Sequence, residues 1–106
     1  MKHMELPETI SAFRKSLEKS TPPDHWPETL KSLWYDARGN WEASHDIAQE
    51  VHSGMGSWIH GYLHWKEGDR WNAGYWYRKA GRPFPEHSLE DEFEILLHSA
   101  LTGAKG

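Results

Sequence analysis

The hydrophobic positions recur at the spacing of α-helices along almost the whole chain. The first predicted helix, at about residues 8–20, carries four apolar residues on one face: Leu6, Ile10, Phe13 and Leu17. The last predicted helix follows a capping pattern at Ser88 and has the clearest apolar face: Leu89, Phe93, Leu96, Leu97, Ala100 and Leu101. Because no segment shows sustained alternation of β-branched residues, we expect an all-α protein.

Glycines and capping residues divide the middle of the chain into four further helices. They are predicted at about 27–38, 41–53, 57–67 and 70–80. Gly39 and Gly68 stand between the members of each pair, and each is followed by an N-cap residue, Asn40 or Asp69. Helices joined by so few residues must fold back on each other. The pattern therefore predicts a single domain over 1–106: a bundle of five or six helices with two antiparallel hairpins, flanking N- and C-terminal helices, and frayed ends at about 1–5 and 103–106.

The second hairpin resembles a tetratricopeptide hairpin. In that family a small residue in the first helix admits the second helix, a Gly-Asp turn follows, and small and aromatic residues recur in the second helix. Seven positions of this chain match the pattern: Gly61, Gly68, Asp69, Ala73, Tyr77, Ala80 and Pro83. The first hairpin matches less well, and the repeat is shorter than the ~34 residues of the family. Both hairpins, over residues 33–83, also resemble small bacterial proteins of about this length, a resemblance that brings no known activity.

The tetratricopeptide resemblance implies a binding surface. Its concave face binds peptide segments and is lined by the first helix of each hairpin. In the second hairpin the corresponding positions are Met55, Trp58, Tyr62, Trp65 and Lys66, and in the first hairpin they are Trp26, Thr29, Leu33 and Asp36. An aromatic groove edged by Lys66 and Asp36 would hold a peptide or a second copy of the chain. The alternative is that these aromatic side chains form the core of a small bundle.

Composition limits the class of protein. The chain has 106 residues, 37% hydrophobic and 13% aromatic, and the large aromatic side chains allow a core without disulfides or a structural metal. There is no cysteine, which excludes a disulfide framework, thiolate metal ligands and a cysteine nucleophile. No apolar run has the length of a signal peptide or a membrane span. We therefore expect a cytoplasmic protein with no membrane association.

The charge distribution argues against nucleic acid as a partner. The net charge is −4, although basic residues gather in the second hairpin and acidic residues follow it. Those basic residues would suit a small anionic ligand or an acidic peptide: Arg70, Arg78, Lys79 and Arg82. The alternative is an ordinary solvated helix face.

Histidines occur in two pairs at helical spacing. His60 and His64 are one turn apart, and His45 and His52 are two turns apart within the helix predicted at 41–53. If the hairpins pack side by side, the two pairs face each other. Imidazole nitrogens that converge at about 2.0–2.2 Å suit zinc, nickel or ferrous iron. The pattern thus gives a candidate metal site made of His45, His52, His60 and His64.

Two alternatives to the four-histidine site stay open at this stage. Asp46 or Glu50 would replace one histidine as a ligand, or would accept a hydrogen bond from a histidine packed in the core. His45 with these carboxylates would also form an acid and base group, but neighbours on a helix point about 100° apart, and the chain has no nucleophile motif or phosphate-binding loop. The sequence therefore favours a protein-interaction module without enzymatic activity. The second hypothesis is a histidine metal protein, with a metal enzyme as one form of it.

Overall fold

The computed structural model describes residues 9–105, and this part of the chain contains six helices and no strand. The helices are α1 (Ile10–Ser16), α2 (Glu28–Ala37), α3 (Trp41–Gln49), α4 (Gly54–Lys66), α5 (Arg70–Lys79) and α6 (Leu89–Lys105). The expected all-α bundle is confirmed. None of these helices has the length and apolar character needed to cross a membrane.

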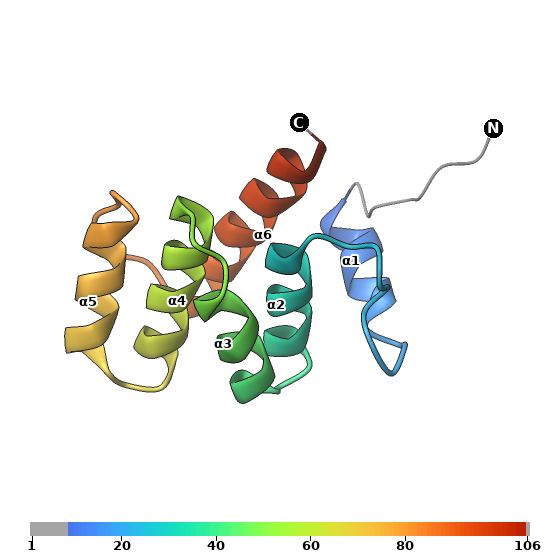
Figure 1. The fold of residues 1–106 in the computed structure, drawn as a ribbon, viewed down its shortest axis with the longest axis horizontal. Coiled ribbons are helices and arrows are strands. Elements are labelled where there is room, and N and C mark those ends of the chain that lie inside the picture. Colours follow the sequence, from blue (N-terminus) through green and yellow to red (C-terminus); the bar gives the residue numbers. More distant parts are fainter. Residues whose placement is uncertain (1–8, 106) are drawn as a thin grey trace.

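The helices form a row of two hairpins with a sixth helix laid across it. Figure 1 shows α5, α4, α3 and α2 standing side by side, with α1 at the far end of the row and α6 behind the others. Helix α6 packs on α4, α2 and α1, so it closes one face of the row. The fold is elongated, with extents of 47 × 27 × 25 Å. The core lies between the hairpins and α6, and its largest fully buried side chains are Trp34, Tyr77, Phe13, Leu30, Leu33 and Ile59.

The two hairpin turns have the same geometry, as the repeated sequence predicts. Gly39 and Gly68 adopt positive φ angles of 83° and 93°, a region that favours glycine. In each turn the next residue donates its backbone N–H to the carbonyl five positions earlier, at 2.8 Å. The side chain of the residue after each glycine then caps the following helix: Asn40 accepts from Ala43 N–H, and Asp69 accepts from Asn72 N–H.

Helix boundaries differ from the prediction at three places. Helix α1 is shorter than expected and ends at Ser16, where three tight i to i+3 bonds turn the chain toward the Pro-rich loop. Helix α3 ends at Gln49 rather than at about 53, and α4 begins earlier, because Ser53 accepts a bond from Gly56 N–H as its N-cap (3.2 Å). Helix α6 continues through 103–105, which we expected to be frayed, whereas residues 1–5 lie outside the described residues.

Candidate metal centre

Three histidines from two helices converge on one point between the hairpins. His45 lies on α3, and His60 and His64 lie one turn apart on α4. One ring nitrogen from each lies within 4.8 Å of the other two, and the Nε2 atoms of His45 and His60 are 2.9 Å apart. At that distance one ring donates a hydrogen bond and the other accepts it.

The packing of α3 on α4 sets the register of this cluster. The indole Nε1 of Trp41, in the first turn of α3, donates to the carbonyl of Leu63 at 2.8 Å. That bond places His45, one turn further along α3, beside the pair on α4. The spacing of four on α4 then brings His64 to the same face as His60. Both features of the sequence, the tryptophan before His45 and the i, i+4 pair, contribute to the geometry.

Two tryptophan rings hold the imidazoles in place. Trp41 stacks on His45 with ring centroids 4.8 Å apart and planes 10° from parallel, and Trp76 stacks on His60 at 4.0 Å and 15°. Trp76 reaches His60 because α5 packs very close to α4 at Gly61, where an added Cβ would lie 2.8 Å from the Tyr77 ring. The aromatic walls restrict ring rotation and shelter the nitrogens from water.

An acidic side chain supports the third imidazole. The Nδ1 atom of His64 lies 2.9 Å from Oε2 of Glu67 at the end of α4. A carboxylate accepts only, so Nδ1 is the nitrogen of His64 that donates this hydrogen bond. Metal-binding histidines commonly have such a carboxylate partner, which fixes the tautomer and raises the basicity of the ligand. Asp69 lies close to the same two side chains, within 4.8 Å.

The local environment lowers the pKa of two of the imidazoles. Burial, together with the nearby His45 and His64, lowers the pKa of His60 to about 4. The pKa of His45 is also lowered, by burial first and then by His64, against the opposing effect of Asp46 and Glu67. Neutral imidazole is the form that binds a metal ion. The environment therefore favours the neutral, metal-binding form of His45 and His60.

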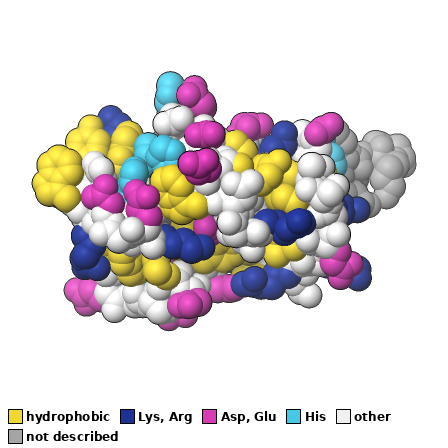
Figure 2. Space-filling model, turned by 90° about the horizontal axis from the view of Figure 1, so that it is seen from below, with side chains coloured by type: hydrophobic (Ala, Val, Ile, Leu, Met, Phe, Trp, Pro, Cys, Tyr) yellow, Lys and Arg dark blue, Asp and Glu magenta, His cyan; other side chains and the backbone are white. Residues whose placement is uncertain are grey.

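The cluster is accessible from one side of the molecule. His60 is buried, whereas His45 and His64 are half-buried. Figure 2 shows histidine side chains gathered at the surface of the face seen from below, between hydrophobic side chains. An ion can thus reach the two half-buried rings without unfolding of the hairpins.

The fourth predicted ligand, His52, does not join the other three. Because α3 ends at Gln49, His52 lies in the connection to α4 and not two turns beyond His45 on one helix. The connection turns sharply here: an added Cβ at Gly56 would lie 1.9 Å from the Val51 carbonyl oxygen. Asp46 and Glu50, the other two ligands that the sequence suggested, are exposed and belong to no metal-ligand group found among residues 9–105.

The aromatic surface that the resemblance implied is covered by α6. Trp58 and Tyr62 are each 3% exposed. The indole Nε1 of Trp58 donates to Oε2 of Glu92 on α6 at 2.7 Å, and the ring of Tyr62 packs on Phe93 with centroids 6.2 Å apart. The structure therefore places both aromatic side chains in the core, which is the arrangement that the alternative expectation described.

The remaining residues of that surface are divided between core and rim. Trp26 is buried and stacks on Phe13 at 5.9 Å, and Trp65 is half-buried against Phe84. Asp36 is buried, and its carboxylate accepts from Tyr62 OH at 3.0 Å and from Lys66 Nζ at 2.8 Å. Lys66 and Asp36 form an ion pair across the two hairpins, and with Tyr62 both line a cavity of about 340 Å³ beside α6.

A buried carboxylate on α6 is a polar feature that the sequence interpretation missed. Glu92 is 3% exposed, and its Oε2 accepts from Trp58 Nε1 and from Tyr77 OH, both at 2.7 Å. Its Oε1 lies 2.6 Å from Nε2 of His87. The sequence does contain an indication that Glu92 is buried. Glu92 lies three residues after Leu89 and four before Leu96, and this spacing puts it on the apolar face of the helix.

No protein-family model, curated protein sequence or solved structure matches this chain. The likeness to tetratricopeptide hairpins thus stays a prediction from seven matched positions. The functional argument rests on the geometry of the side chains themselves.

Proposed function

We propose that the protein binds one divalent transition-metal ion through the imidazoles of His45, His60 and His64. The observation that supports this most directly is the convergence of three histidine ring nitrogens within 4.8 Å. Three further features fit a metal site: the lowered pKa of His60, the tryptophan walls, and the carboxylate behind His64.

The dimensions require only small movements of the rings. A tetrahedral ion with metal-nitrogen bonds of about 2.0–2.1 Å holds its nitrogen ligands about 3.3 Å apart. The Nε2 atoms of His45 and His60 are 2.9 Å apart, so the ion would replace their hydrogen bond and separate them by a few tenths of an ångström. His64 would turn inward about its side-chain torsions while it keeps its bond to Glu67.

The donor set indicates which ions fit and what the site can do. Three neutral imidazoles without a thiolate suit zinc, and also nickel or ferrous iron. Three protein ligands leave a fourth position for water or another ligand, as in catalytic rather than structural zinc sites. The protein-interaction function expected from the aromatic first helices is the second hypothesis, and burial of Trp58 and Tyr62 under α6 favours it less than the metal site.

The test is metal binding by the purified protein without a histidine tag. We expect zinc to bind at one ion per chain, and zinc at 100 times its Kd to stabilise the fold by about 2.7 kcal/mol, a rise in Tm of roughly 10 °C or more. His60→Ala and His64→Ala should abolish both effects, and His45→Gln should do so without leaving a large cavity. The matched control is His98→Ala, because His98 is exposed on α6.

Retention of stoichiometric zinc by the His45 and His64 variants would contradict the proposal. So would a Tm that zinc and a chelator both leave unchanged in the unaltered protein.

A further inference from the structure

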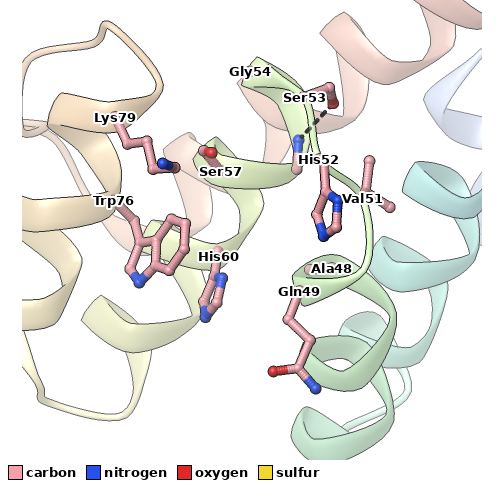
Figure 3. A pocket seen from close by; sticks show the side chains of 11 residues that line it. Ala48, Gln49, Val51, His52, Ser53, Gly54, Ser57, His60, Trp76 and Lys79 are labelled. Carbon is pink, nitrogen blue, oxygen red and sulfur yellow. Dashed lines mark hydrogen bonds between the residues drawn. The ribbon is translucent and has the colours of Figure 1, made fainter.

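A cavity of about 520 Å³ adjoins the histidine cluster and shares one of its residues. It lies between the end of α3, the first turn of α4 and the second half of α5 (Figure 3). His60 lines it and also belongs to the cluster, so the cavity meets the metal site proposed above at this residue, whereas His45 and His64 are not among its lining residues. Its volume falls within the ~300–1,000 Å³ of small-molecule sites.

The charge of the cavity wall is one-sided. Its lining includes Lys79 and His52 but no aspartate or glutamate. In Figure 3 the ammonium group of Lys79 extends past Trp76 toward Ser57 at the start of α4. The 13-residue helix α4 also directs the positive end of its dipole toward this space, because its first turn, from Gly54 on, forms part of the wall. The cavity therefore favours an anion.

Part of the wall is apolar, beside the polar side chains of Gln49, Ser53 and Ser57. Ala48 and Val51 line one side, and the indole of Trp76 lines the other. Trp76 already has one face on His60, so the ring is fixed in position. Such a wall suits a flat or short hydrocarbon group beside the charged end of a ligand.

We propose that this cavity binds a small organic acid whose carboxylate pairs with Lys79 and takes the open position on the metal ion at His60. This inference rests on the proposed metal site. Because carboxylate oxygens are good ligands for zinc and similar ions, the ion and the ammonium group would attract the same charged group. The apolar part of the acid lies against Trp76 and Val51. The binding step is coordination and ion pairing, and no covalent bond of the acid changes.

The test uses the Co²⁺-loaded protein, whose visible absorption reports the ligands of the ion. Benzoate is the probe, benzamide is its uncharged analogue, and inorganic phosphate is an anion without an apolar part. We expect benzoate to change the absorption bands saturably, with benzamide inactive and phosphate weaker. Lys79→Gln should weaken benzoate binding about tenfold, since it removes a charge-assisted contact, while its affinity for Co²⁺ is unchanged.

Arg78→Gln is the matched control. It removes one positive charge from the neighbouring position on α5, which does not line the cavity, and it should leave benzoate binding unchanged.

The outcomes separate the two proposals. Failure of Co²⁺ to bind overturns the metal site and this inference together. Tight Co²⁺ binding with a spectrum insensitive to millimolar benzoate overturns this inference alone, and so does equal loss of benzoate affinity in the Lys79 and Arg78 variants. Binding of phosphate more tightly than benzoate would overturn the assignment to an organic acid.

Discussion

The buried carboxylate of Glu92 makes a strong prediction about stability. Glu92 joins α6 to both hairpin helices α4 and α5, through Trp58 and Tyr77. Every buried side-chain nitrogen or oxygen among the described residues has a hydrogen-bond partner, and Glu92 is the partner of the Trp58 indole and the Tyr77 hydroxyl. The substitution Glu92→Leu keeps a side chain of moderate size but removes the acceptor.

The expected cost follows from the two donors left behind. Trp58 and Tyr77 are 3% and 1% exposed, so neither donor can turn to water. Each of these two unpaired buried donors costs about 1–3 kcal/mol. We therefore expect Glu92→Leu to lower the free energy of unfolding by about 3–5 kcal/mol. Glu92→Gln keeps an acceptor and should cost about 1 kcal/mol.

Urea unfolding followed by far-UV circular dichroism measures these changes, and a double-mutant cycle isolates the network. Tyr77→Phe alone should cost about 1 kcal/mol, but in the Glu92→Leu protein it should be neutral or stabilising, because it removes a hydroxyl that has lost its acceptor. Glu90→Leu, at an exposed position of α6, is the control and should change stability by less than about 0.5 kcal/mol. If Glu92→Leu behaves like Glu90→Leu, or if the two effects simply add, the reasoning is refuted.

Two further predictions concern the metal-free protein. Gly61→Ala should destabilise it by about 1–3 kcal/mol, because the new Cβ would lie 2.8 Å from the Tyr77 ring, whereas Gly74→Ala meets its nearest neighbour at 3.5 Å and should be neutral or slightly stabilising. Thermal unfolding distinguishes the two, and equal effects would contradict the close packing of α4 and α5. The pKa of His60 is near 6.5 in the unfolded chain and about 4 in the folded protein, so protonation of His60 favours unfolding. The contribution of neutral His60 to the free energy of unfolding is therefore full above pH 6.5 and is lost as the pH falls toward 4. With allowance for solvent screening we expect the free energy of unfolding to fall by about 1–2 kcal/mol over this pH range, relative to that of the His60→Gln variant at each pH. If the unaltered protein instead becomes more stable than His60→Gln as the pH falls, the lowered pKa of His60 is contradicted.

The fold was predictable because helix patterning and turn residues agree along this chain. Gly39 and Gly68, each followed by a capping side chain, marked both hairpin turns, and the apolar face of the last helix marked the element that closes the core. Helix ends were less predictable. The end of α3 depends on how Val51 packs against Gly56 after the chain has folded, and the sequence near residue 50 has no proline or glycine to signal it.

The candidate site was predictable in part. The i, i+4 spacing of His60 and His64, and the place of His45 on the facing helix, identified three ligands. The prediction of His52 as a ligand is wrong because it depends on a helix that continues to about residue 53, whereas α3 ends at Gln49. The sequence allowed both a groove and a core position for Trp58 and Tyr62. Amphipathic patterns do not specify which helix face α6 covers, because that depends on tertiary contacts. Trp76 stacks on His60 only because α5 packs closely at Gly61, a contact that appears in the folded chain alone.

The measurement that tests the account most directly is X-ray absorption at the zinc edge of the protein loaded with one equivalent of zinc. The account predicts a four-coordinate ion with three imidazole ligands at about 2.0–2.1 Å and one oxygen ligand, and a loss of imidazole scattering in His64→Ala but not in His98→Ala. A zinc ion surrounded by oxygen ligands, or a spectrum that is identical in the His64→Ala protein, would contradict the central claim that His45, His60 and His64 form a metal site.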